Sequence, residues 1–154
     1  MQMIKMDQTE FQKFYDRSLH EFAKQQSEDT GFSLDECLLK AKLVIDNHFP
    51  DGLSTSNQYL YHLKNESLEA VGYLWFEIRE QINKKKVFIY DILVEQSFRG
   101  LGYSKIMLTW LEAETKRLQI DEISLHVLGY NHRAKALYDS FGFEVTNIYM
   151  SKKV

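Results

Sequence analysis

Apolar residues recur at helical spacing in the first third of the chain, and they predict two helices. The first begins at a capping box, either Asp7 with Glu10 or Thr9 with Gln12. Its apolar positions are Phe11, Phe14, Tyr15, Leu19 and Phe22. Residues 27–31 break this helix, and a second capping box, Ser33 with Glu36, begins the next one. The apolar positions of that second helix are Cys37, Leu38, Ala41, Val44 and Ile45.

After a loop at residues 50–52, the spacing changes to that of strands. Residues 58–64 and 68–79 predict a hairpin, and residues 86–94 are almost continuously apolar, as in a buried central strand. Two further strands are expected over residues 123–128 and 143–150.

Helical spacing returns twice between these later strands. One helix runs from a glycine turn to about residue 117, and a short one covers residues 131–141 and ends at Gly142. The order of elements predicts a mixed α/β (α+β) fold with a β-α-β crossover in its second half. We expect one domain over residues 1–154, because the length suits a single core and no linker or repeat interrupts it.

Composition narrows the class of protein. A hydrophobic content of 44% and a formal net charge of -3 fit a globular chain rather than a disordered one. The longest basic run, Lys84 to Lys86, predicts a solvated turn and not a nucleic-acid surface. Cys37 stands alone and predicts a small buried side chain. Neither a signal-peptide pattern nor a membrane-length apolar run occurs, so we expect a cytoplasmic protein with no nucleic-acid or membrane partner.

Candidate chemistry begins at the turn FRGLGYSKIML, residues 98–108. Two glycines before a helix let an anion approach free N–H groups at the positive end of the helix dipole. A Walker A loop needs a different order of residues, and the third glycine of a dinucleotide fingerprint is replaced by Lys105. The turn therefore predicts an anion site of another kind.

The run from Arg99 to Ser104 resembles the [Q/R]-x-x-G-x-[G/A] motif of GNAT (GCN5-related) N-acetyltransferases, with Ser104 at the last small position. A second stretch, LHVLGYNHRAKALYDSFGFEV over residues 125–145, is similar to that family's pattern N-x-x-A-x-x-L-Y-x-x-x-G-F. The resemblance implies a mostly antiparallel central sheet flanked by helices, in the order β-α-α-β-β-β-α-β-α-β.

The same resemblance implies acetyl-CoA as the acyl-donor co-substrate. The backbone at the end of the central strand would pair with the pantetheine arm, one N–H there would polarise the thioester carbonyl, and the glycine turn would hold the pyrophosphate. The expected cofactor-binding residues are Ile92, Leu93, Val94, Arg99, Gly100, Leu101, Gly102, Tyr103, Ser104, Lys105 and Asn131. Arg99 as a plain surface charge and Asn131 as a helix cap are the alternatives.

Tyr138 is the expected catalytic acid, because the family pattern places a tyrosine hydroxyl at the departing CoA sulfur. His126 is the expected base, since an imidazole titrates in the useful range. Glu77, Asp91 and a water chain remain alternatives for the base. The five histidines show no metal-ligand spacing, so no metal is expected.

These observations predict direct acetyl transfer from acetyl-CoA to an amine through a ternary complex. The acceptor would enter between the N-terminal helices, the loop of residues 49–57 and the strands that carry Tyr73 and Trp75. The competing class is a GNAT-like module that binds acetyl-CoA without turnover. The sequence names no acceptor, and it leaves a homodimer through sheet edges open.

Overall fold

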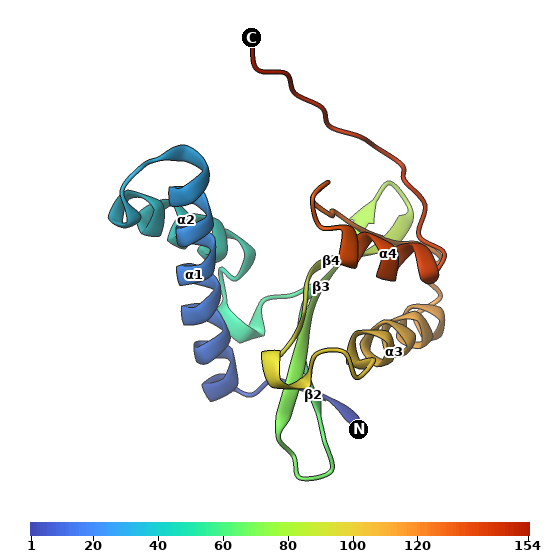
Figure 1. Ribbon diagram of the computed structural model, residues 1–154. Helices are drawn as coiled ribbons and strands as arrows, with labels where there is room; N and C mark the ends of the chain where they lie inside the picture. Colours follow the sequence, from blue (N-terminus) through green and yellow to red (C-terminus); the bar gives the residue numbers. More distant parts are fainter.

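A five-stranded sheet forms the centre of the computed structural model, which describes residues 1–154 (Figure 1). The strands follow the chain order β1-β2-β3-β4-β5 across the sheet. They are β1 (Gln2–Lys5), β2 (Gln58–Lys64), β3 (Ala70–Gln81), β4 (Lys84–Val94) and β5 (Ile123–Leu125). The helices are α1 (Gln8–Thr30), α2 (Leu34–His48), α3 (Tyr103–Arg117) and α4 (His132–Ser140), with 3-10 turns at Gly52–Ser54 and Gln96–Phe98.

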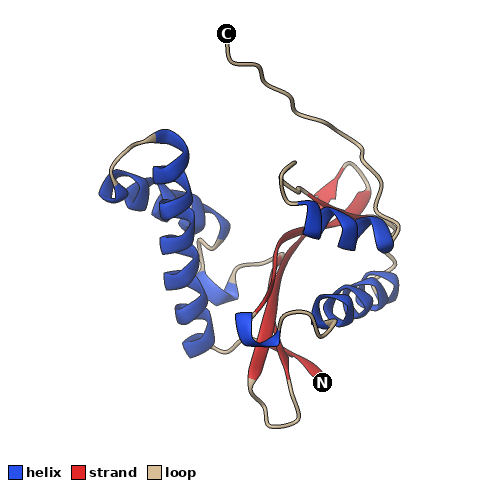
Figure 2. Cartoon of the chain, viewed as in Figure 1, coloured by secondary structure: helices blue, strands red, loops and turns tan.

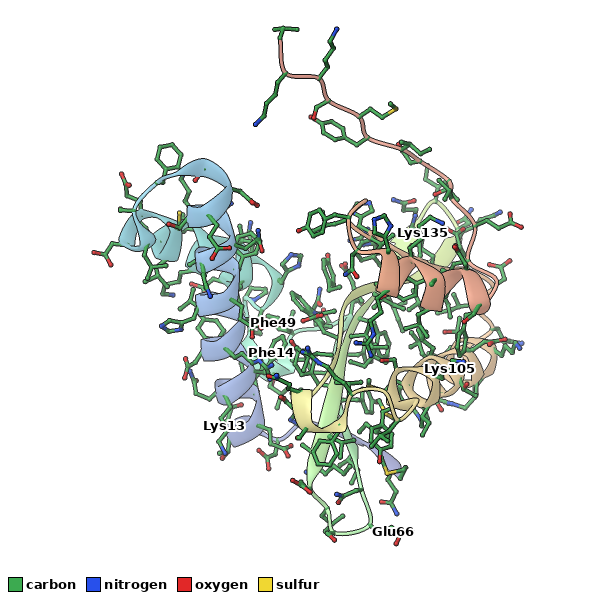
Figure 3. All side chains as sticks on the ribbon, viewed as in Figure 1. Lys13, Phe14, Phe49, Glu66, Lys105 and Lys135 are labelled. Carbon is green, nitrogen blue, oxygen red and sulfur yellow. The ribbon has the colours of Figure 1, made fainter.

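Helices cover both faces of this sheet, α1 and α2 on one side and α3 and α4 on the other (Figures 1 and 2). The larger core lies on the α3 and α4 side and includes Leu74, Met107 and Leu111, all fully buried. On the other side Phe14 and Phe49 meet edge to face, with ring centroids 6.1 Å apart (Figure 3). The mixed, mostly antiparallel sheet between helices is the predicted fold class, which is confirmed.

The N-terminal helices begin where the capping boxes predict. Asp7 accepts from the Glu10 amide and Glu10 accepts from the Asp7 amide, so the first of the two alternative boxes is the one formed. Ser33 and Glu36 make the second box. The non-helical segment between the two helices is shorter than the predicted residues 27–31, because α1 continues to Thr30. The helix ends at Gly31, whose φ of +74° is readily adopted by glycine. Cys37 is buried, as predicted.

Two predictions at the C-terminal end are wrong. The strand expected over residues 123–128 stops at Leu125, and residues 143–150 form no strand at all. The physical reason is the absence of a strand partner: after Phe143 the chain continues as an extended segment that makes no ladder with β5, although residues 144–147 line a groove beside it (Figure 1). The observed order is therefore β-α-α-β-β-β-α-β-α, without the last strand.

The end of β4 is irregular in two ways that shape the site. Asp91 pairs with Trp75 while Ile89 pairs with Phe76, which leaves Tyr90 bulged out of the register with β3. On the other side, parallel pairing with β5 stops at Ile89. The two strands then diverge, so the second half of β4 has no strand partner on its β5 side.

Candidate active site

A cavity of about 420 Å³ opens where β4 and β5 diverge. Its walls are the end of β4, the glycine turn and the first half of α4. Most of the predicted cofactor residues line it, namely Ile92, Leu93, Val94, Arg99, Gly100, Gly102, Tyr103, Ser104, Lys105 and Asn131, together with Tyr138. Residues as far apart in the chain as Ile92 and Tyr138 thus share one cavity.

The glycine turn presents a row of free donors at the mouth of this cavity. Gly100 and Gly102 both have φ of +83°, a backbone conformation that side chains other than glycine strain to adopt. Gly102 is the N-cap of α3 and receives no side-chain cap. The backbone amides of residues 100–104 find no acceptor within the protein, and the first amide to do so is that of Lys105. The free N–H groups of Gly102, Tyr103 and Ser104 lie at the N-terminus of α3, a position that favours an anion, and those of Gly100 and Leu101 precede it in the turn.

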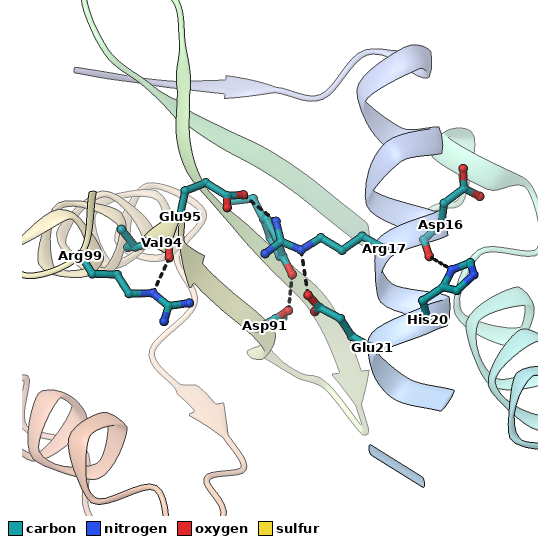
Figure 4. Close-up of polar contacts among 9 residues, drawn as sticks. Asp16, Arg17, His20, Glu21, Asp91, Val94, Glu95 and Arg99 are labelled. Atoms are coloured by element: carbon teal, nitrogen blue, oxygen red, sulfur yellow. Dashed lines mark hydrogen bonds and ion pairs between the residues drawn. The ribbon is translucent and has the colours of Figure 1, made fainter. Parts of the chain in front are cut away.

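The end of β4 contributes further backbone groups. The Glu95 amide bonds to Val71 of β3, and the Leu93 carbonyl lies against Gly72 of the same strand. Because successive residues of a strand point their backbone groups in opposite directions, Ile92 and Val94 turn theirs toward the cavity. The Val94 carbonyl already accepts a 3.1 Å hydrogen bond from Arg99 Nε (Figure 4). The backbone N–H and C=O of Leu93 therefore point toward β3, and only its side chain is able to contact the cavity.

Asn131 and Tyr138 come from α4. The Asn131 side-chain oxygen caps the helix by accepting from the Ala134 amide at 3.1 Å, which leaves its NH₂ group free to donate. Tyr138 is buried, and burial together with the charge of Asp91 raises its pKa to about 12. A tyrosine with that pKa stays protonated at neutral pH, so it is able to donate a proton or a hydrogen bond.

Two predicted residues lie outside the cavity. The side chain of Leu101 is exposed at the outer side of the turn. His126 lies just beyond the end of β5, also exposed, with its ring edge-on to Phe88 at 5.4 Å. It borders a second groove, of about 1020 Å³, which Tyr138 also lines.

A polar cluster lies on the opposite face of β4, under α1 (Figure 4). Tyr73 donates a 2.5 Å hydrogen bond to Asp91 Oδ2, and Arg17 of α1 bonds Glu95 and Glu21 at 2.5 and 3.0 Å. Burial raises the pKa of Asp91, an effect to which the charge of Glu21 adds. Sequence reasoning missed Arg17, Glu21 and Glu95, because a helix and a strand end that are 78 positions apart carry no local signal of contact.

Aromatic rings adjoin this cluster. Trp75 and Tyr90 stack at 4.5 Å, and His48 meets Tyr90 at the same centroid distance. Burial lowers the pKa of His48. Glu77, one of the predicted alternatives for the base, is held by the Tyr90 hydroxyl and by Arg79. Aromatic rings and the Asp91 carboxyl thus lie where the acceptor is expected to enter.

Comparison with known proteins agrees with this geometry. The model of the acetyltransferase (GNAT) family matches residues 10–143. The chain is 31% identical over 149 residues to "Uncharacterized N-acetyltransferase YdgE" of Bacillus subtilis (strain 168), which covers 97% of this chain and 95% of that protein. The crystal structure of the putative acetyltransferase YycN from Bacillus subtilis matches with a TM-score of 0.88 and 29% identity, over 99% of this chain and 98% of that one.

The chain belongs to the GNAT acetyltransferase family. It is an acyltransferase, as the resemblance of the two motifs predicts. The same fold, at a TM-score of 0.61 and 19% identity, occurs in AAC(6')-Iy, whose structure contains a CoA-based bisubstrate analogue, over 99% of this chain and 98% of that one. None of the four helices is both long and apolar enough to cross a membrane.

Proposed function

We propose that this acetyltransferase moves the acetyl group of acetyl-CoA directly to an amine in a ternary complex. The proposal rests on one observation: the glycine turn, the end of β4 and α4 form one continuous surface around the cavity. Five free amides at residues 100–104 adjoin the unpaired side of β4, and Tyr138 faces the same cavity. The names of YdgE and YycN, both N-acetyltransferases, support an amine as the acceptor.

Acetyl-CoA fits the order of groups along this surface. The pyrophosphate would accept from the amides of residues 100–104, with Arg99 and Lys105 adding positive charge. The pantetheine arm would follow the backbone of Ile92 and Val94, which has no strand partner on that side, and the free NH₂ of Asn131 would donate to it. The CoA-based analogue bound to AAC(6')-Iy, a protein of the same fold, supports CoA as the donor.

The transfer itself needs two proton movements. The amine nitrogen attacks the thioester carbon, a C–N bond forms, and the C–S bond breaks. A backbone N–H of β4 would stabilise the oxyanion, and Tyr138 would donate a hydrogen bond or a proton to the departing thiolate. The incoming ammonium must lose one proton before attack and a second as the amide forms.

We assign the removal of the first of these protons to the Asp91 carboxylate. Asp91 immediately precedes Ile92, whose backbone we assign to the pantetheine arm, so it would lie near the reacting thioester. Its raised pKa suits a base better than that of an exposed carboxylate. His126 is a weaker choice because its ring contacts Phe88, which precedes Asp91 by three residues in β4. Three residues correspond to about 10 Å along a strand, so His126 would lie farther from the thioester than Asp91. Glu77 is already bonded to Arg79 and Tyr90.

Calorimetry of acetyl-CoA binding tests the cofactor site. A glutamate in place of Gly102 puts a negative charge beside the pyrophosphate, so we expect micromolar binding by the native chain and none by Gly102→Glu. Gly31→Glu is the matched control, because Gly31 also has a positive φ, lies in open space and ends α1 far from the cavity. The control should bind like the native chain.

Turnover then separates an enzyme from a binding module. Release of free thiol from acetyl-CoA in the presence of a panel of amines measures it. A folded native chain that does not bind acetyl-CoA would contradict the proposed cofactor site. Binding without turnover on any amine of the panel would favour the module.

A further inference from the structure

Arg17 is the only side chain of α1 that forms a hydrogen bond or ion pair with β4 or with the turn that follows it. Its Nη1 lies 2.5 Å from Glu95 Oε1, and its Nε lies 3.0 Å from Glu21 Oε1, one turn farther along the same helix (Figure 4). The guanidinium also lies over the Tyr73 ring, with Cζ 5.8 Å from the ring centroid. A planar guanidinium has donors in fixed directions and is able to bond two carboxylates at once.

Glu95 occupies the point where the proposed cofactor strand ends. Its amide bonds to the Val71 carbonyl of β3 at 3.0 Å, and its carbonyl accepts from the Phe98 amide at 2.9 Å as the chain turns away from the sheet. The preceding carbonyl, of Val94, accepts from Arg99 Nε at 3.1 Å (Figure 4). Two consecutive residues at the end of β4 are thus held by arginines, one from α1 and one from the glycine turn.

The other contacts of α1 with the sheet come earlier in the helix. Glu10 pairs with Lys64 of β2 at 2.6 Å, and Phe14 is buried against aromatic rings of β3. Beyond Arg17, the buried residue of α1 is Ala23, which packs against α2. Arg17 is therefore the last polar anchor between α1 and the sheet, and that anchor is at the end of β4.

The position of this anchor matters for a reaction between two bound molecules. The acceptor is expected on the side of α1, and the thioester is assigned to the backbone of Ile92 and Val94. The distance from the acceptor nitrogen to the thioester carbon would then depend on how α1 lies against the end of β4. A misplacement of about 1 Å between reacting groups costs a rate factor of about 100.

We propose that Arg17 is a positioning residue for the transfer: its contact with Glu95 fixes α1, a wall of the acceptor site, against the strand that holds the thioester. The inference rests on the proposed acetyl transfer to an amine. Arg17 would act through Glu95 and through Tyr73, whose hydroxyl donates to Asp91, without touching the reacting atoms itself.

The charge of Arg17 gives this role a signature in the pH dependence. Burial raises the pKa of Asp91, and the negative charge of Glu21 adds to the rise, whereas the hydrogen bond from Tyr73 and the positive charge of Arg17 oppose it. Tyr138, from α4, stays protonated at neutral pH and adds no charge. Removal of the Arg17 charge should therefore raise the pKa of Asp91 further, and removal of the Glu21 charge should lower it.

Steady-state kinetics of Arg17→Met tests the role. Acetyl-CoA is the donor, and the acceptors are an alkyl diamine, an aralkylamine and a peptide with a free N-terminus. We expect kcat to fall by about 10- to 100-fold. The Kd for acetyl-CoA should stay close to the native value, because the glycine turn and α4 are unchanged.

The pH profile of kcat/KM gives a readout that a merely structural role would not move. The pH at which kcat/KM rises should move upward in Arg17→Met and downward in Glu21→Gln. The pKa of the amine is common to all variants, so the differences report on the protein. Arg17→Lys keeps the charge and loses the fork, so its profile should stay native while its kcat falls.

A partner variant and a control make the test specific. Glu95→Gln should reproduce the fall in kcat, and Arg17→Met/Glu95→Gln should lose little more than either single variant, because both remove the same contact. Arg117→Met is the matched control, since Arg117 bonds Glu114 of its own helix at 2.8 Å in the last turn of α3. The control should keep the native kinetics, and urea denaturation shows that each variant is folded.

The outcomes distinguish this inference from the proposed function. A native chain that acetylates none of the amines would contradict the proposed function and this inference with it. Native turnover with an unchanged kcat in Arg17→Met and Arg17→Lys would overturn the inference alone, whether or not stability falls. Additive losses in Arg17→Met/Glu95→Gln would overturn it as well, because the two side chains would then act separately.

Discussion

The Tyr73 hydroxyl donates a 2.5 Å hydrogen bond to Asp91, and this contact joins β3 to the bulged part of β4 beneath α1. Burial and the negative charge of Asp91 both raise the pKa of Tyr73, while burial raises that of Asp91. Asp91 directly precedes Ile92, in the part of β4 that has no strand partner on its β5 side. A titratable carboxyl is thus held next to the backbone that we assign to the thioester.

Replacement of Asp91 should change how stability depends on pH. The raised pKa means that the folded chain holds the Asp91 proton more tightly than the unfolded chain does. The free energy of unfolding therefore falls as the pH rises from about 4, the ordinary value for aspartate, through the raised pKa. The amide introduced by Asp91→Asn does not ionise, so the variant does not undergo this fall in the free energy of unfolding. Its stability relative to the native chain should therefore increase over that pH interval.

Urea denaturation at a series of pH values measures this difference. Tyr73→Phe is the companion variant, because it removes the hydrogen bond that favours the ionised carboxylate. It should enlarge the total loss of stability and extend that loss to higher pH. A constant difference between Asp91→Asn and the native chain at every pH would show that Asp91 has an ordinary pKa in the folded protein.

The base is identified by comparing Asp91→Asn with His126→Gln. Loss of a general base costs about 100-fold or more in kcat/KM near neutral pH, and we expect that loss for Asp91→Asn. The loss should shrink at high pH, where the amine is already deprotonated. His126→Gln should stay within a few-fold of the native chain, because His126 lies outside the cofactor cavity. The reverse pattern would assign the base to His126.

Tyr138→Phe should lower kcat by about 100-fold and leave the Kd for acetyl-CoA unchanged, since only the hydroxyl at the leaving sulfur is removed. Tyr130→Phe is the control, on an exposed tyrosine just before α4. An acetyl thioester with a more acidic thiol should narrow the difference between Tyr138→Phe and the native chain, because its thiolate needs less help to leave. An equal effect on good and poor leaving groups would argue for a packing role of the ring.

Local rules account for the parts of the fold that the sequence predicts well. The capping boxes at Asp7 and Ser33 and the positive-φ glycines at residues 100 and 102 depend on neighbours within a few positions. The strand at residues 58–64 has the predicted bounds for the same reason. Most of the predicted cofactor residues line one cavity because two separate motifs, at Arg99 and at Asn131, resemble one family whose fold joins them.

Longer-range features escaped prediction for physical reasons. The contact of Arg17 with Glu95 depends on how α1 crosses the sheet, which no local pattern encodes. The residues after Phe143 have the pattern of a strand, but a strand forms only where the backbone makes a ladder with a partner, and these residues make none with β5. The pattern specifies extended backbone there without specifying a partner strand.

Gly72 of β3 keeps the end of β4 in place through its lack of a side chain. A Cβ at Gly72 would lie 2.4 Å from the Leu93 carbonyl oxygen and 3.3 Å from the Val94 Cα, so even alanine must push these residues toward the cofactor cavity. We expect Gly72→Ala to lower the free energy of unfolding by about 1–3 kcal/mol, the usual cost of overpacking. It should also weaken acetyl-CoA binding, because Ile92 and Val94 would shift.

The two effects of Gly72→Ala are separated by a matched control, Gly129→Ala. Gly129 has no heavy atom within 4 Å of the added methyl group and no positive φ, so its replacement should leave stability within about 0.5 kcal/mol. Urea denaturation and acetyl-CoA calorimetry on both variants measure the outcome. If Gly72→Ala loses stability but binds acetyl-CoA as tightly as Gly129→Ala, the end of β4 packs against Gly72 without contributing its backbone to the cofactor, and the assignment of Ile92 and Val94 to the pantetheine arm fails.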